Sequence, residues 1–225
     1  MKIVTNINFN SFVDLLKKQI KLPLPGEDAQ YIMAPKTHLM DQRFSIDHDS
    51  VKKAAVLILL YSSANEIKTV FIKRTAYNGV HSNQISFPGG KSEVSDKSLY
   101  HTACRETYEE IGIKTSDVKL IGKISDLYIP PSNFLVSPYI AHTNTYPLFR
   151  TDPTEVESIL EVKLSQLLKD SVVSEKEVYT AEKNNIKAHC FYINNAVIWG
   201  ATAMMISELK IIINKIPNAD SILLS

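Results

Sequence analysis

The chain has 225 residues, of which 22% are charged, with a net charge of +1 and two cysteines. The near-zero net charge argues against a basic surface for nucleic acid, and two cysteines without metal-ligand spacing exclude a disulfide framework. The first residues lack a basic region followed by an apolar core, and no apolar run reaches the roughly 20 uninterrupted residues of a membrane span. We therefore expect a cytoplasmic protein without a nucleic-acid or membrane partner.

An amphipathic pattern opens the chain. Residues 8–20 carry apolar side chains near the helical period, which predicts a helix, and Pro23 ends it. The segment that follows is irregular, with too little apolar surface for a core of its own. We therefore expect residues 1–50 to form an N-terminal helical extension, packed on a main domain of residues 51–225.

A β-hairpin and a glycine turn are predicted next. Residues 53–61 form a continuous apolar run typical of a buried strand, and residues 69–74 alternate as its hairpin partner, with Asn65 near the turn. Residues 84–87 read as a short strand that ends at the Pro88-Gly89-Gly90 turn.

A helix is expected over residues 97–111. Ser95 or Asp96 can cap its N-terminus, and Gly112 is placed to close it in the left-handed conformation. At 100° per residue, one face collects core residues, among which we place Tyr108, and the other collects glutamates.

The remaining elements follow from the same patterns. They are strands at 119–126 and 134–142 around a proline-bearing loop at 129–133, a helix around 164–168 within 154–170, paired strands over 187–199 with Asn194 and Asn195 at the turn, and a final apolar helix at 200–215.

Three acidic residues of the predicted helix carry the chemistry. Glu109 and Glu110 follow Glu106 by three and four residues. On a helix, the three side chains therefore project over one patch of the surface. Like charges at that spacing repel by roughly 0.2–0.5 kcal/mol per pair. A hard divalent cation removes this penalty, because Mg²⁺ accepts carboxylate ligands together with substrate phosphate oxygens. The plain alternative is a solvated acidic face.

The residues around this cluster resemble the signature of the Nudix hydrolases. Arg105-Glu106-Thr107-Tyr108-Glu109-Glu110-Ile111-Gly112 matches the second half of that signature, with Thr107 at a usually apolar position. The first half is one residue longer than the general pattern, and Asp96 stands where glutamate is usual. The matching residues are Gly90, Asp96, Arg105, Glu106, Glu109, Glu110, Gly112 and Ile113.

The longer spacing, together with the segment at 86–91 (SFPGGK), is similar to the coenzyme A pyrophosphatase branch of this family. Residues 74–84 also resemble the motif that this branch carries just upstream. Two positions depart from that motif, since Gly79 stands where arginine is usual and Asn83 where glycine is usual.

The resemblance implies an α/β fold, a Nudix-type α/β/α sandwich around a mixed β-sheet. It implies hydrolysis of a nucleoside diphosphate linked to another group, here coenzyme A or acyl-coenzyme A, giving 3′,5′-ADP and (acyl-)4′-phosphopantetheine. It also implies Mg²⁺ or Mn²⁺ as the cofactor and a small nucleotide-type molecule as the partner. Folds of this kind often pair, which leaves a homodimer open.

The resemblance and the spacing together define candidate site residues. Glu106, Glu109 and Glu110 are the expected metal ligands, and one of these carboxylates can serve as the base toward water. Arg105 is expected in the catalytic group, as an ion pair that holds the glutamates and Asp96 in place. Asp96 and Gly112 are expected to be structural. The expected substrate-binding residues are Arg74, His81, Gln84, Gly89, Gly90 and Asn133.

Two other functions remain open at this point. The departures at Gly79 and Asn83 favour ADP-ribose or another nucleoside diphosphate derivative as the substrate. A catalytically silent nucleotide-binding module on the same fold is the second alternative, and the complete set of acidic residues argues against it.

Overall fold

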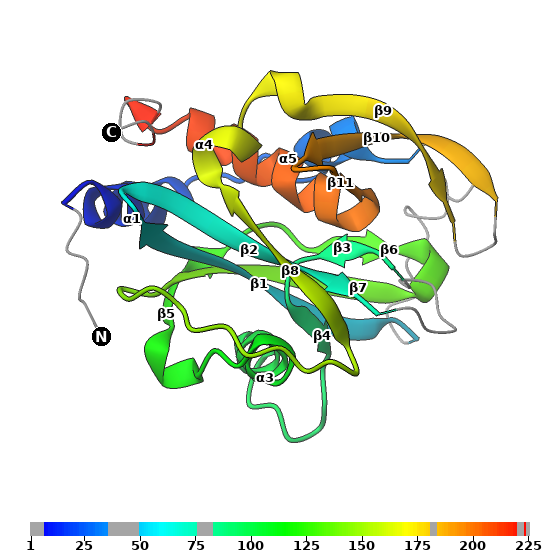
Figure 1. Cartoon of the computed structure of the whole chain (residues 1–225), viewed down its shortest axis with the longest axis horizontal. Helices are drawn as coiled ribbons and strands as arrows, with labels where there is room; N and C mark the ends of the chain where they lie inside the picture. Colours follow the sequence, from blue (N-terminus) through cyan, green and yellow to red (C-terminus); the bar gives the residue numbers. More distant parts are fainter. Residues whose placement is uncertain (1–6, 36–49, 76–82, 181–183, 220–222, 224–225) are drawn as a thin grey trace.

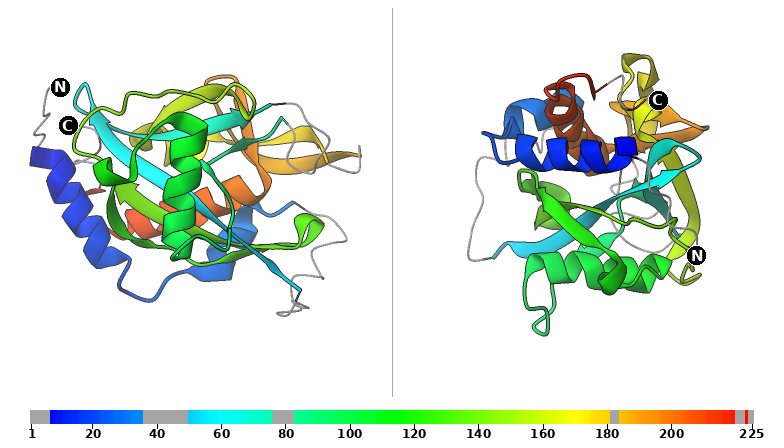
Figure 2. Two further views of the ribbon diagram at one scale, coloured as in Figure 1. Left: turned by 90° about the horizontal axis from the view of Figure 1, so that it is seen from below. Right: turned by 90° about the vertical axis from the view of Figure 1, so that its left-hand side faces the viewer.

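The computed structural model describes residues 7–35, 50–75, 83–180, 184–219 and 223. A mixed β-sheet lies between two helical layers, with α3 on one face and α1 and α5 on the other (Figures 1 and 2). This arrangement confirms the predicted α/β/α sandwich. The helices are α1 (Ile7–Gln19), α2 (Gly26–Gln30), α3 (Leu99–Ile111), α4 (Leu164–Leu167) and α5 (Gly200–Asn214). None of the helices in the described ranges is long and apolar enough to cross a membrane.

The large sheet has eight strands, and a three-stranded sheet packs beside α5. The strands of the large sheet are β1 (Lys52–Ser63), β2 (Glu66–Arg74), β3 (Ile85–Ser86), β4 (Gly89–Lys91), β5 (Lys119–Lys123), β6 (Leu127–Ile129), β7 (Phe134–His142) and β8 (Val156–Lys163). Those of the small sheet are β9 (Val173–Tyr179), β10 (Asn185–Ile193) and β11 (Ala196–Trp199).

Strand β1 is the centre of the large sheet, in the order β3-β2-β1-β7-β5. It pairs in parallel with β7 and antiparallel with β2 and β4. Both of its faces are buried, because Ile58 and Leu60 belong to the core on the α5 side while Leu57 and Leu59 belong to the core on the α3 side. This explains why the run is apolar without alternation.

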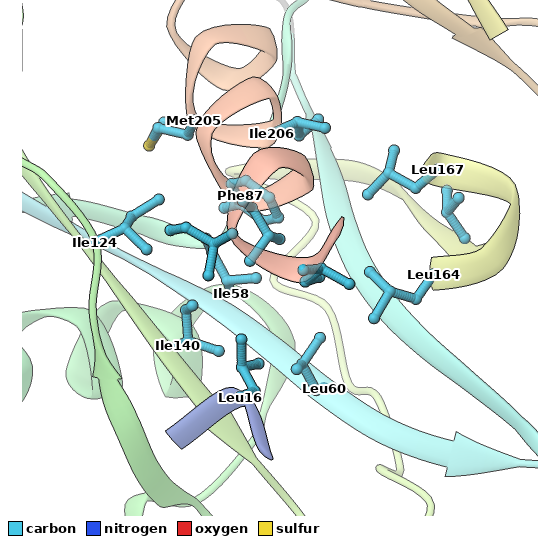
Figure 3. Close-up of a cluster of buried hydrophobic side chains, with 14 of the residues drawn as sticks. Leu16, Ile58, Leu60, Phe87, Ile124, Ile140, Leu164, Leu167, Met205 and Ile206 are labelled. Atoms are coloured by element: carbon cyan, nitrogen blue, oxygen red, sulfur yellow. The ribbon is translucent and has the colours of Figure 1, made fainter. Parts of the chain in front are cut away.

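The core on the α5 side draws on segments far apart in the chain (Figure 3). Leu16 of α1, Ile58 and Leu60 of β1, Leu164 of α4 and Met205 of α5 all belong to it. Because Leu16 is fully buried there, α1 contributes to the same core as the sheet.

Helix α3 carries the acidic residues, and both of its ends are defined by local chemistry. Its N-terminus is capped by Ser98, whose hydroxyl accepts a hydrogen bond from the His101 amide at 3.2 Å, so the predicted cap at Ser95 or Asp96 is wrong. Gly112 has φ 77° and closes the helix in the left-handed conformation, as predicted. Tyr108 is 52% exposed, so its placement on the core face is also wrong.

Several further predictions need correction. Strand β8 was not expected, since residues 154–170 were predicted only to contain a helix, and β6 and β9 were also missed. Helix α2 lies in the segment predicted to be irregular. The asparagine turns are confirmed, because Asn65, Asn194 and Asn195 have φ angles of 62°, 53° and 63° and join β1 to β2 and β10 to β11.

Candidate functional site

The site begins at Gly89 and Gly90, which were predicted to lie in a turn but belong to strand β4, paired with Val56 and Ala55 near the start of β1. Gly89 has φ 147°, and a Cβ there would lie 2.6 Å from the Cα of Val56, so the position requires glycine. At Gly90 an added side chain would collide with a candidate site residue, because a Cβ would come within 2.5 Å of the carboxyl carbon of Glu106. The Glu106 carboxylate therefore lies directly against the backbone of β4.

Glu110 lies one helical turn further along α3, and its position corrects the prediction of one exposed acidic face. It is fully buried, and its carboxylate accepts hydrogen bonds from Arg74 Nη1 at 2.9 Å and from the amide of Gly89 at 2.8 Å. Burial raises its pKa to about 8, although Arg74 and the Gly89 amide oppose the shift. A metal ligand at this position would be a carboxylate held by the protein rather than one moving in solvent.

Arg105 connects β4, the loop before α3 and the remaining glutamates. Its Nε and Nη2 donate to the two oxygens of Asp96 at 3.0 and 3.1 Å, and Nη2 also donates to the Lys91 carbonyl at 3.0 Å. Nη1 donates to Glu106 Oε1 and to Glu109 Oε2, both at 2.9 Å. The geometry is that of an orienting residue, since every donor is directed at a fixed acceptor.

Asp96 anchors this network rather than capping α3. Its side chain is 1% exposed and accepts hydrogen bonds from Arg105, from the Thr102 hydroxyl at 2.8 Å and from the Glu93 amide at 3.0 Å. These bonds, that from Arg105 foremost, hold the pKa of Asp96 well below its usual range. Asp96 is thus ionised at neutral pH and fixes Arg105.

Glu155 joins the acidic cluster from outside the helix and was not predicted. It lies on the loop before β8, half exposed, with a carboxylate oxygen 3.9 Å from Arg74 Nη2. Its charge raises the pKa of both Glu106 and Glu110, whose main cause is burial. No local pattern marks this residue, because only the pairing of β8 with β2 brings it to the site.

The carboxylates suit a hard divalent cation by their chemistry, since they are oxygen donors with excess negative charge. As the side chains stand, Arg105 engages Glu106 and Glu109, while Arg74 and Gly89 engage Glu110. Accordingly, the described part of the chain contains no group of three or more acidic, histidine or cysteine side chains arranged as a ready-made metal site. Metal binding would require these ion pairs to rearrange.

The other predicted substrate-binding residues are not brought together. The carbonyl of Gln84 accepts a hydrogen bond from the Arg74 amide at 3.0 Å, which places its backbone beside Arg74. The Asn133 side chain accepts from the Tyr128 hydroxyl at 3.1 Å and donates to the Ser50 carbonyl at 3.1 Å. His81 lies outside the described residues. Substrate contact by these three residues stays a prediction.

A family model for the NUDIX domain matches residues 51–185, which include β4, α3 and Glu155. The chain belongs to the Nudix hydrolase family. It is 31% identical over 158 residues to the uncharacterized Nudix hydrolase NudL of Yersinia pestis (strain Pestoides F), covering 70% of this chain and 78% of that protein. Nudix hydrolases act on nucleoside diphosphate derivatives and generally use divalent metal ions, so this chain is a pyrophosphohydrolase.

Solved structures agree on the fold. A MutT/nudix family protein from Enterococcus faecalis has a TM-score of 0.53 at 14% identity, covering 79% of this chain and 68% of that one. The Nudix hydrolase RenU from M. smegmatis has a TM-score of 0.52 at 11% identity, covering 74% of this chain and 88% of that one. At sequence identities this low, the similarity to these two structures concerns the Nudix fold alone.

Proposed function

We propose that this Nudix hydrolase requires Mg²⁺ or Mn²⁺ and cleaves the diphosphate of coenzyme A or acyl-coenzyme A, releasing 3′,5′-ADP and (acyl-)4′-phosphopantetheine. One observation carries the catalytic part of the proposal. Two consecutive glycines each meet a carboxylate, Gly89 donating its amide to Glu110 and Gly90 lying against Glu106. A diphosphate can approach such a backbone closely because no side chain projects from it.

Glu106, Glu109 and Glu110 are the residues that would hold the metal. A bound divalent cation would neutralise charge on the diphosphate oxygens and lower the pKa of water. Neighbouring charge supports this assignment: burial is the main cause of the raised pKa of Glu106, and the charges of Glu109 and Glu155 add to it while Arg105 opposes it.

The protein residues orient the reacting groups. Arg74 and the Gly89 amide fix the Glu110 carboxylate, and Arg105 fixes Glu106 and Glu109. A carboxylate of this cluster accepts the proton of the attacking water as the water oxygen bonds to phosphorus and the bridging oxygen leaves. Glu109 is suited to that role by its exposure of 51%, which leaves it accessible to water.

The choice of coenzyme A rests on the segment at 86–91 and the longer box spacing. Asn83 departs from the branch motif, but its φ of 59° is the left-handed conformation that asparagine and glycine tolerate best. Asparagine at this position therefore keeps the backbone shape that glycine would adopt, and the departure at Asn83 weighs less against coenzyme A.

The test is incubation of the pure protein with Mg²⁺ and coenzyme A, followed by detection of 3′,5′-ADP. Glu106→Gln and Glu110→Gln should each lower kcat by at least 100-fold, and Glu177→Gln on strand β9 is the matched control. Turnover of either site variant within a few-fold of wild type would refute the metal assignment.

ADP-ribose is the second candidate substrate, favoured by the departure at Gly79. A panel of nucleoside diphosphate derivatives ranked by kcat/KM separates the two, because discrimination between substrates is expressed in that ratio. Thermal stabilisation by nucleotides without any product would instead identify a silent binding module.

A further inference from the structure

A cleft of about 570 Å³ lies at the C-terminal end of α3, outside the contacts between β4 and the glutamates. Two apolar side chains line it with unusual exposure, Tyr108 at 52% and Leu148 at 80%. Two cations, Lys114 and Arg150, line it as well. Neither cation makes a side-chain hydrogen bond or an ion pair among the described residues. The cleft therefore offers apolar surface next to two cations without side-chain partners in the described ranges, and the acids Glu109 and Asp152 line it as well.

The loop that carries Arg150 is fixed to the end of the helix. The Arg150 amide donates to the Ile111 carbonyl at 2.9 Å, and the Asp152 amide donates to the Glu110 carbonyl at 3.1 Å. Gly112 allows this close approach, because a Cβ there would come within 2.9 Å of the Cβ of Arg150. The backbone of the loop thus holds Arg150 in place, while its guanidinium is free to bind a ligand.

The cleft is joined to the acidic cluster by one residue. Glu109 lines the cleft, and its carboxylate accepts a hydrogen bond from Arg105 Nη1, which also donates to Glu106. A molecule with its diphosphate at Glu106 and Gly90 can therefore extend past Glu109 into the cleft. Of the two acids in the cleft, Glu109 is paired with Arg105, while Asp152 is oriented by the amide and hydroxyl of Thr154 and keeps its negative charge.

We propose that this cleft binds the nucleoside end of the substrate, a base packed on Tyr108 and Leu148 with an additional phosphate monoester held by Arg150 and Lys114. The inference rests on the proposed function, and it defines the substrate class as nucleotides that carry a phosphate besides the cleaved diphosphate. An aromatic ring stacks on any base, and guanidinium and ammonium groups are the usual partners of phosphate.

The decisive measurement is binding rather than turnover. Isothermal titration in metal-free buffer compares 3′,5′-ADP with 5′-AMP, which lacks the second phosphate. The wild type should bind 3′,5′-ADP about tenfold tighter or more, the range expected for charge-assisted hydrogen bonds. Arg150→Gln combined with Lys114→Gln should abolish this preference and leave 5′-AMP affinity within twofold. Tyr108→Ala should weaken both ligands by about tenfold, through lost stacking.

Lys187→Gln, an exposed cation on β10, is the matched control and should change neither affinity. An equal affinity of the wild type for the two ligands would overturn the proposal. So would a double variant with a lower melting temperature but an unchanged preference, because the two cations would then only complement the negative end of the helix dipole. If the wild type hydrolyses coenzyme A and either of these two results is obtained, the proposed function stands and the assignment of the cleft is refuted.

Discussion

The carboxylate of Glu106 lies so close to Gly90 that a methyl group added to the glycine would approach its carboxyl carbon to 2.5 Å. The neighbouring residue makes a different demand, since a Cβ on Gly89 would meet the backbone of β1 first, at the Ala55 carbonyl oxygen and the Val56 Cα. Two adjacent glycines of strand β4 thus serve different purposes: Gly90 leaves room for the Glu106 carboxylate, and Gly89 allows β4 to pack against β1.

Gly90→Ala should separate activity from stability. Because the Glu106 side chain can move aside, we expect a folded protein with a melting temperature near that of wild type. We also expect kcat to fall by about 100-fold, since a misplacement of about 1 Å has that cost. Steady-state kinetics and thermal unfolding on the same sample check both. Gly89→Ala should instead destabilise the protein, and equal loss of stability in the two variants would contradict the distinction.

Glu110 predicts a pH dependence of stability in metal-free protein. Its pKa is about 8 when folded, against an ordinary value of 4.5, so the folded state holds a proton that the unfolded state releases. The stability it contributes is present below about pH 4.5 and is lost as the pH rises to about 8, at up to roughly 1.4 kcal/mol per pH unit. Urea unfolding of wild type in EDTA should follow this decline.

Glu110→Gln is the comparison that isolates this group. As the pH rises from 5 to 8, the unfolding free energy of the variant should increase relative to that of wild type. Added Mg²⁺ should stabilise the wild type more at pH 8 than at pH 6, because binding to an ionised ligand adds stability by mass action. A difference that stays constant with pH would show that Glu110 ionises normally.

Asp96→Asn tests the anchor of Arg105. Removing the charge leaves a partly buried guanidinium without its main partner, and we expect a loss of roughly 3 kcal/mol at pH 7. The folded-state pKa of Asp96 is lowered, so its contribution is present above its unfolded pKa and disappears as pH falls through the folded value. Chemical denaturation at pH 7 and pH 3 should show the gap between wild type and variant beginning to narrow at the lower pH.

The surface pair Asp170–Lys210 offers the control for that experiment, because the Asp170 side chain is fully exposed. Asp170→Asn should leave the unfolding midpoint near that of wild type. If Asp96→Asn behaves like this control, the buried network around Arg105 does not contribute to stability.

Glu155→Gln tests the carboxylate that the tertiary fold adds to the cluster. Its negative charge raises the pKa of Glu106 and Glu110, so its removal should lower both. We expect the acid limb of the kcat/KM profile to move to lower pH, with a fall in kcat of about tenfold or more. Glu157→Gln, a half-exposed neighbour paired with Lys73, is the matched control. An unshifted acid limb would remove Glu155 from the site.

The sequence by itself determined the central strands and helix α3, whereas the predicted glycine turn is strand β4 in the structure. These features depend on local periodicity, on caps such as Gly112 and on residue spacing, and all of these are visible within a short window. Strand β7 was predicted with its observed ends, and the acidic residues were singled out by their spacing together with the resemblance to the Nudix signature.

Only the tertiary structure decided the character of each acidic residue. A helical projection places Glu110 beside Glu106, but Arg74 and the Gly89 amide, from two other strands, bury it and shift its pKa. Glu155 arrives through the pairing of β8 with β2, and β9 is recognisable only by its pairing with β10, since three consecutive charged residues interrupt its apolar pattern. Burial and charge coupling depend on which groups meet across the fold, and pairings between distant strands leave no periodic trace in either segment.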